Sequence, residues 1–82
     1  ARIVAGETEL FEQLVRKHQT RVYNLALRMV SEPADAEDCA QEAFIKAYRG
    51  LKSFKGESSF STWLYRITFN ICIDFSRKNE VL

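Results

Sequence analysis

The scarcity of helix-breaking residues is the feature that most limits how this chain can fold. Its 82 residues contain one proline and three glycines, and these lie between stretches in which apolar residues recur every three or four positions. That spacing places apolar side chains on one side of an α-helix. The sequence therefore predicts an all-α fold, a compact bundle of three to four helices.

Length and composition limit the fold further. We expect one domain, residues 1–82, which must be well packed because a chain this short buries only roughly 60% of its unfolded surface. Apolar residues make up 46% of the chain, but no uncharged apolar run is long enough for a membrane span or a signal peptide. We therefore expect a cytoplasmic protein. The chain begins at Ala1 without a methionine, which suggests a domain excised from a longer protein.

The first half of the chain contains two helical stretches. Residues 7–30 predict two short helices or one bent helix, because a polar break at 17–20 interrupts the apolar spacing. The second helix is expected to run to about Gly50, with Pro33 tolerated at its start and Asp35 as its N-cap.

This second helix separates small apolar residues from acidic and polar ones. Its inner side is expected to carry Ala36, Ala40, Ala43, Phe44, Ala47, Tyr48 and Leu51. Its outer side is expected to carry Asp38, Gln41, Glu42, Ile45 and Arg49. The alanines allow a neighbouring helix to approach closely.

The second half of the chain predicts a loop at 54–58 and one last helix, with Ser58 or Ser61 as its N-cap. The buried side of this helix is expected to carry Phe60, Trp63, Leu64, Ile67, Ile71 and Phe75, with Trp63 as an anchor of the core. A second line follows at i, i+4, i+7 and i+11: Arg66, Asn70, Ile73 and Arg77.

The net charge of +1 conceals a separation of charge along the chain. Residues 32–42 contain five acidic residues and no basic one, whereas residues 46–55 contain four basic residues and no acidic one. Two fields of opposite sign favour two different partners.

The loop and the last helix together are a candidate surface for single-stranded nucleic acid. Arg66 and Asn70 lie one turn apart, where the first can meet phosphate and the second can read a base edge. Tyr65 or Phe69 could stack on unpaired bases, each contributing about 1–3 kcal/mol. The plainer alternative is a set of solvated charges beside a core tryptophan.

The outer side of the second helix favours docking to a protein. Ile45 beside Asp38, Gln41 and Glu42 suits a partner helix that offers arginines around an apolar spot, although an ordinary solvated face with one exposed isoleucine is the alternative. Acid–base catalysis or a divalent metal is disfavoured, because no His, Lys or Ser is placed to complete a reaction centre. We therefore expect neither an enzyme nor a cofactor.

The remaining chemically notable residues suggest structural roles. Cys39 and Cys72 lack a CxxC pairing and His18 is not at ligand spacing from either, so two buried thiols are favoured over a zinc site or a disulfide. Asp74 is expected on the apolar side of the last helix, where it would need an internal partner such as Arg28.

Two motifs in order resemble region 2 of the extracytoplasmic-function (ECF) sigma factors, group IV of the sigma-70 family. Residues 35–48, DAEDCAQEAFIKAY, are similar to the segment that binds the clamp helices of RNA polymerase. The resemblance resumes at 54–67, FKGESSFSTWLYRI, and continues with Asn70, Asp74 and Arg77 at the family's spacing. Together these motifs cover most of residues 10–78.

The resemblance implies a domain that docks on core RNA polymerase and melts the promoter minus-ten element by accepting a flipped base of the nontemplate strand. The residues implied to meet the β′ clamp helices are Asp35, Asp38, Gln41, Glu42 and Ile45. Those implied to bind DNA are Lys46, Phe54, Lys55, Gly56, Glu57, Ser58, Ser59, Tyr65, Arg66, Asn70 and Arg77. Preferential binding of the single strand would drive melting.

The chain also departs from the family's pattern. Cys39 replaces the usual Leu, Val or Ile, and Thr68 and Cys72 are unusual in the last helix, which leaves a redox response open. The family's helix-turn-helix domain (region 4) is not contained in these residues. Alternatives are an interaction module held mainly by an anti-sigma factor, a helical scaffold that has lost DNA reading, and, least favoured, a hydrolase.

Overall fold

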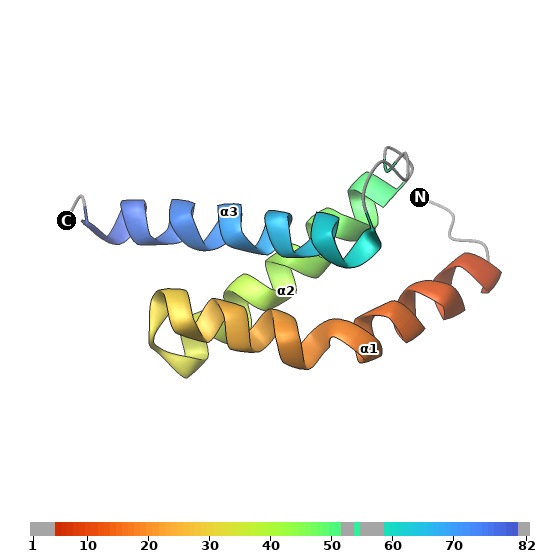
Figure 1. The fold of residues 1–82 in the computed structure, drawn as a ribbon, viewed down its shortest axis with the longest axis horizontal. Helices are drawn as coiled ribbons and strands as arrows, with labels where there is room; N and C mark the ends of the chain where they lie inside the picture. Colours follow the sequence, from red (N-terminus) through yellow and green to blue (C-terminus); the bar gives the residue numbers. More distant parts are fainter. Residues whose placement is uncertain (1–4, 52–53, 55–58, 81–82) are drawn as a thin grey trace.

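The computed structural model describes the backbone of residues 5–51, 54 and 59–80 and the side chains of residues 9–51, 54 and 59–78. Within these ranges the chain forms three α-helices: α1 (Ala5–Val30), α2 (Pro33–Gly50) and α3 (Phe60–Glu80). Each helix packs against the other two. In Figure 1, α3 lies above α1 and α2 crosses between them. The predicted all-α bundle is confirmed. None of these described helices is long and apolar enough to cross a membrane.

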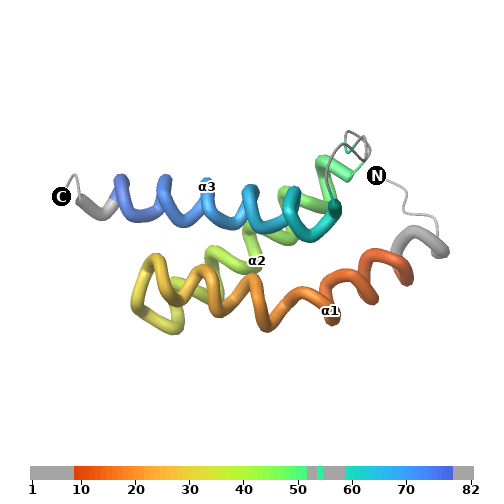
Figure 2. The backbone as a smooth tube through the Cα atoms, in the orientation of Figure 1, coloured from red at the N-terminus to blue at the C-terminus, as the bar shows by residue number. Residues whose placement is uncertain are grey.

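The first helical stretch is one helix whose axis changes direction along its length, as the tube in Figure 2 shows. Of the two predicted alternatives, the bent helix is therefore the one found. His18, Val22 and Ala26 lie at four-residue intervals on its inner side and are buried, which is the spacing that one side of an α-helix requires.

The turn between α1 and α2 consists of Ser31 and Glu32. Ser31 has a positive φ of 69°, and its N–H donates to the Leu27 carbonyl at 2.9 Å, which closes the end of α1. Glu32 is the N-cap of α2 without a side-chain capping bond, and Pro33 is the first helical residue. The predicted N-cap, Asp35, is wrong. Proline's fixed φ suits the first helical position, so α2 begins earlier and Asp35 lies in its first turn.

The start of α3 is set by a serine that the sequence analysis did not choose. The Ser59 Oγ accepts the N–H of Thr62 at 3.1 Å, and the Ser59 hydroxyl donates to the Thr62 Oγ1 at 2.9 Å. Ser61 is therefore not the N-cap, because it already lies inside α3. The other predicted cap, Ser58, lies outside the described residues.

The core combines small side chains from α2 with larger ones from α1 and α3. Its buried apolar residues are Val22, Ala26, Ala36, Cys39, Ala40, Ala43, Ala47, Leu64, Ile71 and Cys72. The four alanines of α2 lie on the inner side that the sequence predicted, and they allow α1 and α3 to approach α2 closely. The predicted outer residues of α2 are exposed.

The buried side of α3 follows the prediction with two additions. Leu64 and Ile71 are buried, and the other predicted members pack against the core while partly exposed. Thr68 and Cys72 are also fully buried. The hydroxyl of Thr68 donates to the Leu64 carbonyl one turn earlier at 2.9 Å, so its burial leaves no polar atom unsatisfied.

The predicted internal pair of Asp74 and Arg28 is wrong, because both residues are exposed. The core side of α3 runs through Leu64, Ile71 and Phe75. Asp74 precedes Phe75 by one residue and therefore points about 100° away around the helix axis. Its carboxylate remains in water and needs no internal partner.

Candidate nucleic-acid and protein interfaces

Three aromatic rings form a cluster where α2 ends and α3 begins. The centroid of the Phe54 ring lies 5.0 Å from that of Trp63 and 6.1 Å from that of Phe60, and Phe60 and Trp63 are 5.8 Å apart. A Cβ added at Gly50 would lie 3.3 Å from the Trp63 Cζ2, so the indole packs directly on the last turn of α2. Trp63 and the half-buried Phe54 therefore hold the end of α2 against the start of α3.

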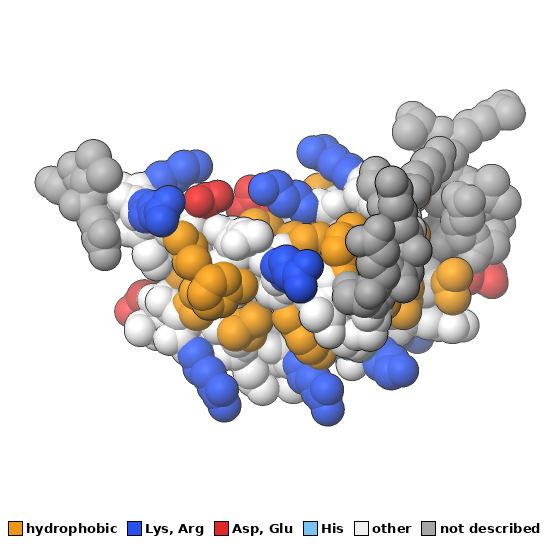
Figure 3. Space-filling view, turned by 45° about the horizontal axis from the view of Figure 1, so that its top comes forward, with side chains coloured by type: hydrophobic (Ala, Val, Ile, Leu, Met, Phe, Trp, Pro, Cys, Tyr) orange, Lys and Arg blue, Asp and Glu red, His pale blue; other side chains and the backbone are white. Residues whose placement is uncertain are grey.

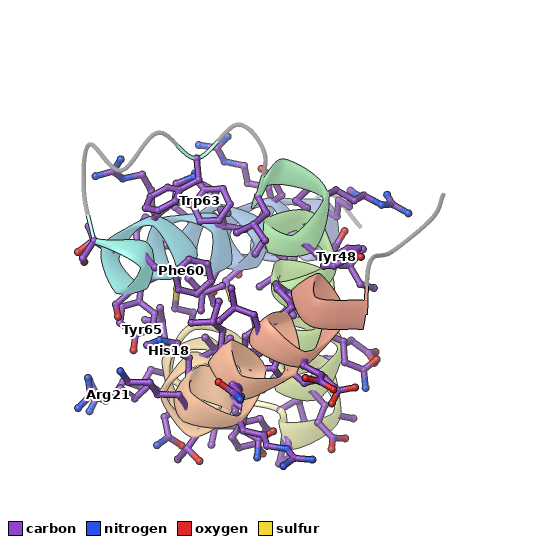
Figure 4. All side chains as sticks on the ribbon, turned by 90° about the vertical axis from the view of Figure 1, so that its right-hand side faces the viewer. His18, Arg21, Tyr48, Phe60, Trp63 and Tyr65 are labelled. Atoms are coloured by element: carbon purple, nitrogen blue, oxygen red, sulfur yellow. The ribbon has the colours of Figure 1, made fainter. Side chains whose placement is uncertain are left out.

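Tyr65 is joined to α1 through His18. The Tyr65 hydroxyl lies 3.4 Å from the His18 Nδ1, and the two rings meet edge to face at 82°. Figure 4 shows both side chains between α1 and α3. Burial lowers the pKa of His18, and Lys17 and Arg21 lower it further. The imidazole is thus neutral at pH 7, and in the tautomer protonated at Nε2 its Nδ1 can accept a hydrogen bond from the Tyr65 hydroxyl.

Sequence reasoning missed this contact. His18 was considered only as a metal ligand, although its position four residues before Val22 places it on the buried side of α1. That position was the signal that a structural partner should exist.

The exposed side of α3 carries the polar residues of the predicted line, whereas its apolar member, Ile73, is half-buried. Arg66, Asn70 and Arg77 are exposed, and Phe69 beside them is 46% exposed. Figure 3 shows an apolar strip along this face with Lys and Arg side chains on both sides. Cations can meet phosphates, an amide can read a base edge and a ring can stack on an unpaired base. These are the groups that binding of a single strand requires.

The remaining predicted DNA-binding residues that the structure describes come from α2, the α2–α3 connection and the first turns of α3. Lys46 is exposed on α2, and Tyr65 is half-buried against His18. Ser59 is exposed, but its hydroxyl caps α3. The predictions for Lys55, Gly56, Glu57 and Ser58 fall outside the described residues.

The outer side of α2 exposes the residues predicted to meet a protein partner. Asp38, Gln41 and Glu42 are exposed, and Ile45 among them is 51% exposed. Asp35 is half-buried near the start of the helix. A branched aliphatic side chain therefore lies in water surrounded by carboxylates and an amide.

A groove of about 380 Å³ adjoins this side of α2, and sequence reasoning did not predict it. It lies between α1 and α2, and its lining includes Gln19 and Tyr23 from α1 and Gln41 and Phe44 from α2. Its residues come from two helices whose relative placement no local pattern reveals. Gln41 thus belongs both to the outer side of α2 and to the groove.

The two cysteines form the buried thiols that the sequence predicted. Cys39 and Cys72 are free and buried. Burial raises the pKa of Cys39, and burial, reinforced by the adjacent Cys39, raises the pKa of Cys72 to about 11. Both are therefore protonated at neutral pH, which makes them poor nucleophiles and metal ligands. Among the described residues, no three His, Cys, Asp or Glu side chains gather as a metal site would need.

Comparison with known proteins agrees with the resemblance found in the sequence. The family model for Sigma-70 region 2 matches residues 14–81. The RNA polymerase sigma-H factor of Pseudomonas aeruginosa is 49% identical over 69 residues, which cover 84% of this chain and 36% of that protein. The ECF RNA polymerase sigma factor SigW of Bacillus subtilis is 44% identical over 75 residues, which cover 92% of this chain and 40% of SigW. The chain thus spans well under half the length of these curated relatives.

A solved structure has the same fold. The NMR structure of an engineered region 2 of sigmaE, in complex with GTAAAA, matches with a TM-score of 0.82 and 43% sequence identity. The match covers 92% of this chain and 78% of the other. By sequence and by fold, this chain belongs to the Sigma-70 region 2 family, and its relatives include ECF RNA polymerase sigma factors.

Proposed function

We propose that this chain docks on core RNA polymerase and recognises and melts the promoter minus-ten element by capturing a flipped base of the nontemplate strand. The observation that carries the proposal is the exposed line of Arg66, Asn70 and Arg77 beside the exposed ring of Phe69. The relatives are RNA polymerase sigma factors, and a region 2 of the same fold was solved in complex with GTAAAA.

Melting by this surface needs no covalent chemistry. The Arg66 guanidinium would meet a phosphate, the Asn70 amide would donate to and accept from a base edge, and the Phe69 ring would stack on a base. A base reaches these groups only after it leaves the duplex, so the surface binds the single strand more tightly. A hundredfold preference corresponds to about 2.8 kcal/mol in favour of the open form.

The proposed DNA surface also includes the residues around the α2–α3 connection. Phe54 and Tyr65 hold this end of the bundle in place through Trp63 and His18, and Lys46 adds an exposed cation. Ser59, and residues 55–58 outside the described part of the chain, join the proposed DNA surface because of the sequence resemblance alone.

The outer side of α2 is the proposed docking surface for the β′ clamp helices. Ile45 offers an apolar contact surrounded by Asp38, Gln41 and Glu42, with Asp35 at the edge. Such a surface is complementary to a helix with arginines around an apolar spot. The chain would act as one non-catalytic domain without a cofactor, in the cytoplasm where the polymerase works.

The groove beside Gln41 supports a second candidate function, capture by an anti-sigma factor. A partner segment seated between α1 and α2 would contact Gln19 and Tyr23 and would also cover part of the proposed polymerase surface. Such capture would regulate the first function and would not replace it.

Fluorescence anisotropy with short oligonucleotides tests the DNA proposal. The chain should bind the strand GTAAAA more tightly than a permuted strand or the matching duplex. Asn70→Ala should lower the affinity for the preferred strand about tenfold, the loss expected when one contact to a base edge is removed. Gln19→Ala, which removes an exposed amide from the groove, is the matched control and should bind normally. Equal binding of all strands would contradict base capture.

Docking is tested separately with an isolated clamp-helix segment of β′. Ile45→Ser should weaken binding to this segment, whereas Leu10→Ser changes another exposed aliphatic residue, 56% exposed on α1, and should not. Equal binding by Ile45→Ser and the unaltered chain would contradict the proposed docking surface and leave the DNA proposal untouched.

A further inference from the structure

The second half of α1 carries a line of cations that the proposed function does not use. Residues 13–31 contain four basic residues and no acidic one. Lys17, Arg21, Asn24 and Arg28 follow at intervals of four, three and four, which places them on one side of the helix, and all four are exposed. The same intervals separate Arg66, Asn70, Ile73 and Arg77 on α3.

The contact between His18 and Tyr65 places this α1 line beside α3. Lys17 directly precedes His18, and Arg21 follows it by three residues. Both cations are close enough to His18 to lower the pKa of its imidazole, and His18 lies 3.4 Å from the Tyr65 hydroxyl. Figure 4 shows Arg21 and Tyr65 on the same outer side of the molecule. The α1 line therefore borders the seam between the two helices.

An apolar strip separates the α1 line from the polar line of α3. Tyr65 points toward α1. Phe69 follows one turn later, and Arg66 and Asn70 lie about 60–100° further around α3. On the face drawn in Figure 3, apolar side chains gather between Lys and Arg side chains above and below them.

Among the described side chains, the charges of the α1 line are not neutralised by ion pairs. Like charges four residues apart on a helix repel each other, and no carboxylate in the described part of the chain forms an ion pair with Lys17, Arg21 or Arg28. An anionic partner would relieve this repulsion. Aromatic surface beside the cations favours nucleic acid, because unpaired bases stack on rings while phosphates meet cations.

We propose that Lys17, Arg21 and Arg28 form a second phosphate-binding line, so that a captured single strand runs along the α1–α3 seam. The backbone lies on the α1 side, and the bases lie across Phe69 toward Asn70. This inference rests on the proposed function and extends it from one helix to two. In this arrangement α1 binds the phosphates irrespective of sequence, and α3 recognises the bases.

The salt dependence of binding tests this division. Each phosphate contact on a single strand contributes about 0.7 to the slope of log affinity against log salt concentration. Arg21→Gln should reduce the slope by about 0.7, and the triple variant Lys17→Gln, Arg21→Gln, Arg28→Gln by about 2. Arg16→Gln is the matched control, since Arg16 is exposed on α1 but lies off the line, and its slope should not change.

Sequence preference provides the second readout. The α1 variants should lower the affinity for GTAAAA and for the permuted strand by the same factor, because phosphate contacts carry no sequence information. Asn70→Ala should instead lose preference while it keeps the slope. An unchanged slope in the triple variant, or an equal change in Arg16→Gln, would overturn the inference. Polyglutamate serves as an anionic polymer without bases. If the triple variant lost binding to polyglutamate but not to the oligonucleotides, the α1 line would bind an acidic protein partner, and the inference would be overturned.

Failure of the proposed function would be recognised separately. Oligo(dT) offers phosphates without the proposed base sequence. If the unaltered chain showed no preference among strands but the triple variant lost its salt dependence on oligo(dT), base capture would fail and the α1 line would stand. If the chain preferred GTAAAA and every α1 variant kept the same salt slope, base capture would stand and the α1 line would fail.

Discussion

Ser31 adopts a backbone conformation that is costly for any residue with a Cβ atom. Its φ of 69° lies in the left-handed region, where helices usually end in glycine. The hydrogen bond from its N–H to Leu27 shows that the conformation is needed to close α1 before Pro33 starts α2.

Ser31→Gly should therefore increase the free energy of unfolding. Glycine removes a Cβ penalty of about 1–2 kcal/mol but adds about 0.4–1 kcal/mol of conformational freedom to the unfolded chain, and the midpoints of these ranges leave a net gain of about 0.8 kcal/mol. Urea unfolding measures the difference. Ser31→Ala retains the Cβ and should bring no gain, so equal stability of the two variants would contradict the explanation.

His18 should make stability depend on pH just below neutrality. Its pKa in the folded chain lies below the ordinary value of 6.5, first because of burial and then because of Lys17 and Arg21. As the pH falls through about 6.5, the unfolded chain binds a proton before the folded chain does, so the free energy of unfolding decreases.

Urea unfolding between about pH 7.5 and about pH 5.5 measures this loss, a window that lies above the usual carboxylate pKa values. His18→Gln, which cannot titrate, should be nearly flat over the same range. If His18→Gln lost as much stability as the unaltered chain, groups other than His18 would cause the pH dependence.

At the scale of helices, the N-termini of α2 and α3 are stabilised in different ways. α2 relies on Pro33 and has no side-chain cap, whereas α3 begins with the Ser59 hydroxyl bonded to Thr62. The start of α3 is therefore the more sensitive to a single substitution.

Ser59→Ala should destabilise the chain by about 1 kcal/mol, the usual loss for an N-cap serine. For a domain of this size, that corresponds to a fall of about 4–8 °C in Tm, which thermal unfolding followed by circular dichroism would detect. Ser61→Ala is the control because Ser61 lies inside α3, and it should change stability by less than about 0.5 kcal/mol.

The helices were predictable from the sequence because their signals are local. Apolar spacing and the position of Pro33 predicted α2 and its alanine side, and the four-residue interval between Arg66 and Asn70 predicted the exposed line of α3. The caps were not predictable in the same way. Asp35 and Ser61 carry suitable side chains, but the choice between neighbouring candidates depends on backbone angles set by packing.

The contacts between helices could not be read from local patterns. His18 and Tyr65 are 47 residues apart, and the groove at Gln19 and Gln41 exists only because α1 and α2 pack together. The prediction for Asp74 failed for a related reason. Neighbouring residues on α3 point about 100° apart, so an error of one residue in placing the core side changes whether a carboxylate is expected to be buried or exposed.

At the scale of the whole molecule, each helix packs against both others, so the thiols of α2 and α3 are protected by the complete bundle. Cys39 and Cys72 are 2% and 0% exposed. Their exposure to reagent should require opening of the bundle as a unit.

Both thiols should therefore react slowly with a thiol reagent and at similar rates, and urea should accelerate the two together. The raised pKa values slow the reaction further by suppressing the thiolate. Mass spectrometry of the labelled chain measures each site, with Lys78→Cys as an exposed and rapidly labelled control. Much faster labelling of one native thiol would indicate that its helix detaches alone.

The unbroken course of α2 has a consequence for how its two ends work together. The proposed docking residue Gln41 and the packing residue Gly50 lie on one helix, nine residues and therefore about 13.5 Å apart along its axis. Each added residue would lengthen this separation by about 1.5 Å and rotate one end against the other by about 100°. α2 thus fixes both the distance and the rotation between the proposed polymerase-docking surface and the end of α2 that packs against Trp63.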